Sequence, residues 1–237
     1  MSILKRMLML VVAAALMGAC TKGSPPQKDE PKSVPVTPAA PAEKADGLFP
    51  GADLRLVYSV TDQGQPAVAV DEDWLRDGDR IVATYNGTPY VTWLLRSDGV
   101  WRADPGGSGV LLRYLPPELQ DGTVWKQTSG GQDIWFKLTR ESSQWLLQVV
   151  NRAEVTLFRF SPAAGPYRVE SINYANPSHS FVKQQLSSSP GKVEAGTRAA
   201  HLKNMPSPAL QAAPVTAATL QEFAEALNRV TQTKPAP

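Results

Sequence analysis

The sequence contains one cysteine, two histidines and no long hydrophobic run, and each shortage excludes a class of site or fold. A single cysteine cannot form an internal disulfide, so any folded domain must be held together by its core alone. The two histidines, His179 and His201, lie far apart and lack the close spacing of three or four ligands that a zinc site needs. The apolar run over residues 7–17 is much shorter than the about 20 residues of a membrane-spanning helix.

Charge of one sign is not in excess either. The chain has 24 Lys and Arg against 22 Asp and Glu, and residues 1–19 hold two of the bases, Lys5 and Arg6, but no acid. Proteins that bind nucleic acids concentrate basic charge to displace counterions, so we expect no nucleic-acid partner. Electrostatic adhesion to a membrane is not expected as the main anchor. No phosphate-binding glycine motif is present, and we expect no cofactor.

The first 20 residues have the pattern of an export signal. Lys5 and Arg6 precede the apolar run, and small residues follow it. Met17-Gly18-Ala19-Cys20 resembles the lipobox of bacterial lipoproteins, with Met17 where Leu is usual. The resemblance implies that residues 1–19 are a signal peptide and that Cys20 is the lipid attachment site, its sulfur carrying a diacylglycerol. Two or more acyl chains give stable anchoring, so the membrane is an expected partner through this lipid.

The residues after Cys20 bear on location and reach. Thr21 stands where an Asp retains lipoproteins at an inner membrane, which implies the outer membrane in a two-membrane cell. In a one-membrane cell the protein would lie on the outer face of the cytoplasmic membrane. Residues 20–47 hold the lipid-bearing cysteine and a proline-rich stretch with no aromatic residue before Asp46, which cannot bury enough apolar area to fold. We therefore predict a disordered, semi-rigid N-terminal tether.

Residues 48–189 have the texture of a β domain, with short apolar runs separated by turn signals. Asn86-Gly87 between residues 80–85 and 88–96 predicts a tight hairpin, because this pair tolerates positive φ at both turn positions. A parallel sheet would need long crossover connections, which are absent. Trp145 and Leu146 make one strand apolar on both faces. We predict a mainly β fold, a curved antiparallel meander that forms a barrel, a half-barrel or a sandwich.

The C-terminal part divides into three segments. Residues 190–215 form an irregular segment rich in Pro and Ala, and residues 232–237 form a disordered tail. Between them, residues 216–231 predict one amphipathic helix, since apolar residues recur at helical spacing and Thr219 and Glu222 fit a capping box. We expect this helix to dock on the β domain; contact with a partner protein or a membrane surface is the alternative.

No catalytic or metal-binding motif is complete. Gly106-Gly107-Ser108-Gly109 does not match the nucleophile motif of serine hydrolases. The acidic cluster within residues 71–79 fails the EF-hand spacing and is expected to be a solvated loop between strands. We therefore predict no metal site, and the weak candidates for calcium ligands are Asp71, Asp73, Asp77 and Asp79.

The tryptophans provide the best candidates for contact with a ligand or partner. In a regular strand, Trp135 shares one face with Asp133 and Lys137, and Trp74 lies in the acidic cluster. An aromatic ring among polar groups suits stacking on a sugar or packing on a partner. The alternative is that these rings pack on neighbouring strands or under the C-terminal helix.

A second resemblance covers residues 110–185. Leu115-Pro116, Gly122-Thr123-Val124-Trp125 and the turn Pro162-Ala163-Ala164-Gly165 resemble the G-T-x-W and P-A-G-x-[YF] patterns of uncharacterised envelope lipoproteins. It implies a curved antiparallel sheet without catalysis. The sequence thus favours a lipid-anchored, non-enzymatic binding or interaction module at the cell envelope, its partner a protein or a glycan. The alternatives are an enzyme acting on cell-wall glycans and a lipid-carrying half-barrel.

Overall fold

The computed structural model describes residues 42–63, 65–103, 110–203 and 211–233. The predicted signal peptide, Cys20, the tether up to residue 41, Ser108 and the end of the tail lie outside this part of the chain. None of the helices in the described ranges is long and apolar enough to span a membrane.

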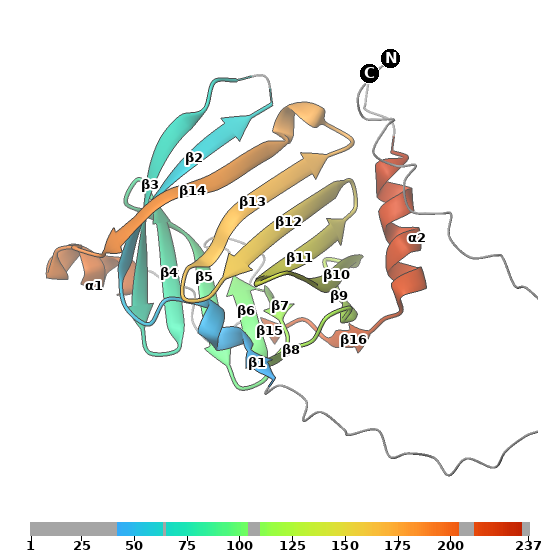
Figure 1. Ribbon diagram of the computed structural model, residues 1–237, viewed down its shortest axis with the longest axis horizontal. Coiled ribbons are helices and arrows are strands. Elements are labelled where there is room, and N and C mark those ends of the chain that lie inside the picture. Colours follow the sequence, from blue (N-terminus) through green and yellow to red (C-terminus); the bar gives the residue numbers. More distant parts are fainter. Residues whose placement is uncertain (1–41, 64, 104–109, 204–210, 234–237) are drawn as a thin grey trace, which may run out of the picture. The chain divides into compact units, whose positions relative to one another are not determined.

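The described chain is mainly β, as predicted, and fourteen of its strands form one sheet (Figure 1). All neighbours pair antiparallel except β15 and β7, and the order is β15-β7-β6-β5-β4-β3-β2-β14-β13-β12-β11-β10-β9-β16. The strands are β2 (Leu54–Asp62), β3 (Val68–Asp77), β4 (Arg80–Tyr85), β5 (Thr88–Arg96), β6 (Gly99–Ala103), β7 (Val110–Leu115), β9 (Val124–Ser129), β10 (Gln132–Glu141), β11 (Gln144–Asn151), β12 (Glu154–Ser161), β13 (Gly165–Asn173), β14 (Phe181–Pro190), β15 (Gln211–Ala212) and β16 (Val215–Ala217).

Local sequence signals explain most of these strands. Asn86 and Gly87 have φ of 48° and 76°, which confirms the tight turn between β4 and β5. The acidic cluster differs from its prediction, because Asp71 and Asp73 lie within β3 rather than in a loop. Residues of this strand alternate between the two faces of the sheet, so Glu72 is buried while Asp71 is exposed.

The sheet curls so that strands far apart in its order face each other. The ring of Tyr114 on β7 lies 5.4 Å from that of Phe158 on β12 and 5.7 Å from that of Phe136 on β10. These contacts join strands near opposite ends of the sheet, so its inner face encloses the main hydrophobic core. The predicted curvature is therefore present, and it follows from strands that are apolar on both faces.

The two ends of the sheet meet at a seam, formed by β7, β9 and residues 211–217. Within this one segment, β15 pairs with β7 and β16 pairs with β9. Inside the seam, the buried amide of Gln127 donates to the carbonyl of Arg113 and accepts from its backbone N–H, both at 2.9 Å. The side chain thereby supplies the hydrogen bonds that a neighbouring strand would otherwise provide.

One end of the curled sheet is filled by the start of the folded chain. Here β1 (Glu43–Lys44) pairs with β8 (Glu118–Leu119), and the 3-10 turn η2 (Ala45–Leu48) follows. Leu48 and Phe49 are buried, and the Phe49 ring lies 5.2 Å from that of Trp93. Residues 43–47 thus belong to the folded unit and not to the predicted tether, because burial of Ala45 and Leu48 holds them in place.

The C-terminal helix, α2 (Leu220–Thr231), packs on the outer face of the sheet, as expected. Thr219 and Glu222 form the predicted capping box. The helix begins at 220 rather than 216, because β16 takes the residues just before it. Its buried face, formed by Phe223, Ala226 and Val230, lies against β9 to β12.

Two further helices complete the described chain. The 3-10 turn η3 (Pro177–His179) precedes β14. The helix α1 (Ala195–Lys203) occupies part of the segment predicted as irregular. Arg198 fixes it to the sheet by donating to Asp53 at 2.9 Å and to the carbonyl of Arg76, contacts that the local sequence pattern does not indicate.

Candidate functional site

The inner face of the sheet encloses a cavity of about 670 Å³. This volume lies within the range of small-molecule sites, which is about 300–1,000 Å³. Most of the lining is apolar or aromatic, with a few polar side chains among the rings, as is typical of such sites. The apolar and aromatic part includes Val60, Trp74, Tyr85, Tyr90, Val91, Trp93, Leu112, Tyr114, Ile134, Val149, Phe158, Pro166, Val169 and Phe181; the polar part consists of Asp62, Glu72, Arg102, Asn151, Glu154, Thr156 and Lys183.

The exposed lining residues of the cavity lie at one end of the curled sheet, which forms its mouth. Phe49 and η2 fill the opposite end, where Phe49 packs on Trp74, Trp93 and Phe160. At the open end the lining residues Asp62 and Asn151 are exposed, and the Tyr85 side chain is 46% exposed. This mouth is formed by hairpin ends, where strands such as β2 and β11 finish and β3 and β12 begin.

Glu72 is the most deeply buried charged residue on the cavity wall, with 1% of its surface exposed. The indole of Trp74 donates to its carboxylate at 3.1 Å, and the hydroxyl of Tyr90 donates at 3.0 Å. The ammonium of Lys183 completes the set as an ion pair. A buried carboxylate is tolerated only when it is paired and hydrogen-bonded in this way.

Lys183 reaches Glu72 from β14 by crossing the intervening strand β2. Its ammonium lies 4.0 Å from the ring centroid of Tyr58 on β2 and donates to the Tyr90 hydroxyl at 2.9 Å. Burial lowers the pKa of Lys183, because desolvation outweighs the attraction of Glu72. Burial also raises the pKa of Tyr58 and Tyr90 well above 10.0, so both hydroxyls stay protonated at neutral pH.

Arg102 brings a second cation to the cavity from β6. Its guanidinium lies 5.1 Å from the ring centroid of Tyr114 and donates to the hydroxyl of that residue at 2.9 Å. The rings of Trp93 and Phe158 lie 5.6 and 5.8 Å away. Aromatic faces attract a desolvated cation, so these rings hold the guanidinium against the cavity wall.

The sequence singled out one of these cavity residues, Trp74. Its side chain is 1% exposed and lies in the core rather than in a solvated loop. Gly165, in the P-A-G turn, has φ of 68°, and a Cβ there would lie 2.7 Å from the Trp74 ring. Glycine is therefore required at this turn for both its backbone conformation and the close approach of the indole.

The other three candidates lie on the outer face, around α2. Trp135 is packed with Phe223 and Val230 beneath the helix, in agreement with the alternative expected for it. Asp133 accepts a hydrogen bond from Thr128 at 2.7 Å, which lowers its pKa. The ammonium of Lys137 lies 5.9 Å from the Phe223 ring. Asp133 and Trp135 border a hollow of about 270 Å³, and none of the three candidates lines the inner cavity with Trp74.

Two of the four weak metal candidates, Asp71 and Asp77, are engaged in ion pairs near the surface. Asp71 pairs with Arg55 at 2.7 Å, and Asp77 pairs with Arg80. Across the part of the chain that the structure describes, no three His, Cys, Asp or Glu side chains gather as metal ligands would.

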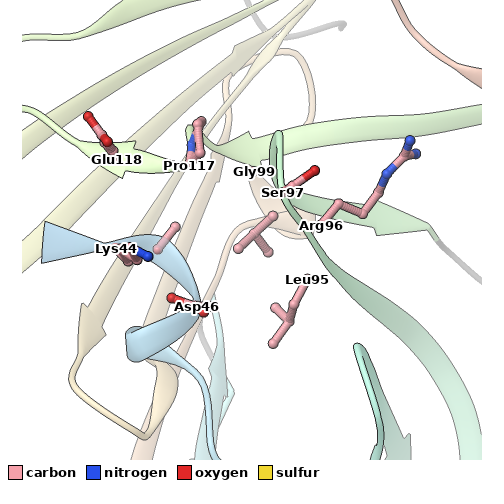
Figure 2. Close-up of a pocket in the computed structure, with 10 residues that line it drawn as sticks. Lys44, Asp46, Leu95, Arg96, Ser97, Gly99, Pro117 and Glu118 are labelled. Atoms are coloured by element: carbon pink, nitrogen blue, oxygen red, sulfur yellow. The ribbon is translucent and has the colours of Figure 1, made fainter.

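A second hollow, of about 300 Å³, lies at the filled end of the sheet (Figure 2). Lys44 and Asp46 line one side of it, and Leu95 and Arg96 line the other. Figure 2 shows the guanidinium of Arg96 pointing away from Asp46, so the charges do not converge on a common point. The inner cavity is therefore the better candidate site.

Comparisons with known proteins add little. No protein-family model matches the sequence, and no curated protein matches it either. Among solved structures, a LolA superfamily protein from Nitrosomonas europaea is similar over 65% of this chain and 97% of its own, with 10% identity and a TM-score of 0.25. A likeness at this level carries no argument about function.

Proposed function

We propose that the folded unit is a non-catalytic binding module whose inner cavity holds a small molecule of the lipid class. The observation that supports this most is the cavity itself, about 670 Å³ with a mainly apolar and aromatic lining. Apolar surface of this extent gains free energy when a ligand displaces water from it. The proposal thus selects the lipid-carrying alternative among the functions that the sequence leaves open.

The placement of the aromatic rings favours a lipid over a glycan. Rings that stack on sugars stand among polar groups at an accessible surface. Trp74 and Trp93 are at most 2% exposed and line an inner wall instead. A carrier also needs no reactive group, and the carboxylate of Glu72 is engaged by Tyr90 and Lys183.

We further propose that the module is anchored through a lipid on Cys20, with residues 21–42 as its tether. At about 3.1 Å per residue in extended polyproline form, this tether would let the cavity work several tens of Å from the bilayer. Export to the cell envelope and anchoring at an outer membrane surface remain parts of the proposal and follow from the lipobox resemblance.

The proposal is tested by extracting bound lipid from the full chain carrying Cys20→Ser, produced and purified without detergent. Mass spectrometry should find close to one acyl-chain molecule per protein. Thr156→Trp, which fills the cavity from β12, should lower this amount at least several-fold. The matched control is Thr139→Trp on the outward face of β10, which should retain the lipid. Absence of lipid from the parent chain, combined with no uptake of added lipid, would refute the proposal.

A further inference from the structure

We propose that the ligand enters the cavity with its hydrocarbon chain first and leaves its head group in water at the mouth. The substrate class is then an amphiphile recognised by its chain, whose head group can be neutral, charged or bulky. This inference rests on the proposed function, because it specifies how a lipid lies in the cavity and which lipids are accepted.

The closed end of the cavity is lined by aromatic rings. Trp74 and Trp93 lie next to Phe49, whose ring centroid is 6.4 and 5.2 Å from theirs. Tyr114 and Phe158 continue this wall, since the Tyr114 ring lies 5.4 Å from Trp93 and 5.4 Å from Phe158. Such a surface favours the burial of CH₂ groups and disfavours an unpaired charge. The end of the ligand that reaches Phe49 is therefore the end of its chain.

The charged side chains inside the cavity already have partners in the protein. Glu72 pairs with Lys183, and Arg102 donates to the hydroxyl of Tyr114 at 2.9 Å. Glu154 accepts hydrogen bonds from two neighbouring hydroxyls at 2.8 and 2.6 Å. A head group drawn into the cavity would lose its water and would have to displace one of these contacts. Burial of the head group is therefore unfavourable, whereas burial of the chain disturbs no polar contact.

The mouth offers the environment that a head group needs. The lining residues Asp62 and Asn151 are exposed there, and Tyr85 is 46% exposed. An amphipathic tyrosine ring suits the boundary between an apolar chain and water. Asp62 and Glu154 lie at strand ends beside the mouth, so a negative head group meets a weak repulsion that water and salt screen.

Calorimetry on the lipid-stripped full chain carrying Cys20→Ser tests the inference with four probes, each used below the concentration at which it forms micelles. Laurate, 1-dodecanol and dodecyl maltoside share one chain length and differ in the charge and size of the head group. Dodecanedioate has the same chain with a carboxylate at each end. We expect the first three to bind within about fivefold of one another, because their head groups stay in water. Dodecanedioate should bind at least about tenfold more weakly than laurate, because one carboxylate would be buried without a partner.

Charge variants connect the head group to the mouth. Asp62→Lys should raise the affinity for laurate relative to 1-dodecanol about two- to threefold at low salt, and high salt should remove the difference. Asp79→Lys is the matched control, since Asp79 is an exposed acid in the turn between β3 and β4, at the opposite end of the sheet. It should leave the ratio of the two affinities unchanged. Equal ratios for the two variants at low salt would place the head group away from the mouth and contradict the inference.

NMR of bound laurate reports its direction in the cavity. Nuclear Overhauser effects should connect the terminal methyl group to the indole of Trp93 at the closed end. The methylene group next to the carboxylate should show none to Trp93.

The outcomes separate this inference from the proposed function. Dodecanedioate binding as tightly as laurate, or contacts from the carboxylate end of laurate to Trp93, would overturn the inference and leave the lipid-binding function standing. Binding of laurate without binding of dodecyl maltoside would do the same, because it would show that the head group must enter. Binding of none of the three single-headed probes would overturn both.

Discussion

At the scale of single residues, the wall of the cavity contains an ion pair between Glu72 and Lys183. The fold brings these two residues together although they lie 111 positions apart in the sequence. Glu72 and Lys183 are not neighbours on adjacent strands, because β2 lies between them. Both face inward by strand alternation, and the ring of Tyr58 on β2 supports the lysine between them. The pair thus needs correct register over three strands.

Because Lys183 is buried, we predict that it loses its proton at a lower pH than an exposed lysine does. By NMR of the dimethylated lysines, assigned with Lys183→Arg, we expect Lys183 to titrate below 10.5, its ordinary value. The unfolded chain keeps this proton up to 10.5, so between the two pKa values the unfolded state binds more protons. The contribution of Lys183 to the free energy of unfolding therefore rises with pH in that window. A midpoint at or above 10.5 would contradict the desolvated site.

Sequence reasoning identified Trp74 at this scale and missed Glu72, Lys183 and Arg102. Trp74 stands out in the sequence because it lies beside acids, but its burial depends on β3 being a strand rather than a loop. The three charged residues look like ordinary surface residues in isolation. Only the alternation of Val70, Glu72 and Trp74 on one face of β3 offered a signal that a carboxylate points inward.

At the scale of elements, the seam formed by β7, β9 and residues 211–217 closes the sheet without direct pairing of its two edges. The side chains of Gln127 and Trp125 bridge to the backbone of Arg113, and the indole of Trp125 also stacks on Phe136 at 5.2 Å. The tryptophan of the G-T-x-W pattern therefore has a structural role in the seam.

Removal of the bridging amide should loosen the seam. Gln127→Leu leaves the part-buried N–H of Arg113 without this acceptor, and we expect it to lower the free energy of unfolding by about 1–3 kcal/mol. Denaturant unfolding gives this value, and hydrogen exchange at Arg113 should become faster. Gln132→Leu, at an exposed position of β10, is the control and should change stability by less than about 0.5 kcal/mol. Equal stability of the two variants would show that the amide does not hold the seam.

Hairpins and the capped helix could be predicted because their signals are local, as Asn86-Gly87 and the Thr219–Glu222 box show. The seam could not, since its contacts join a side chain to a distant backbone. Residues 211–217 carry no pattern of their own, and they become β15 and β16 only because two strand edges are available to them. For the same reason α1, fixed by Arg198, was expected to be irregular.

At the scale of the whole molecule, we propose that a binding cavity is joined to a membrane anchor. The mainly β class and the curvature followed from strands that are apolar on both faces, as Trp145 and Leu146 show. The cavity did not follow, because the same strands could equally have packed solid against each other. Its volume depends on how tightly the sheet curls, which is set by the seam and by the filling of one end with Phe49.

The most direct test of ligand binding in the cavity is an NMR titration of the indole N–H signals with laurate, using the lipid-stripped full chain that carries Cys20→Ser. Trp74 and Trp93 line the cavity, whereas Trp101 and Trp135 pack on the outer face. We predict that the signals of Trp74 and Trp93 shift on binding while those of Trp101 and Trp135 stay in place. Shifts confined to Trp135, with Trp74 and Trp93 unchanged, would place the ligand beneath α2 and contradict the account.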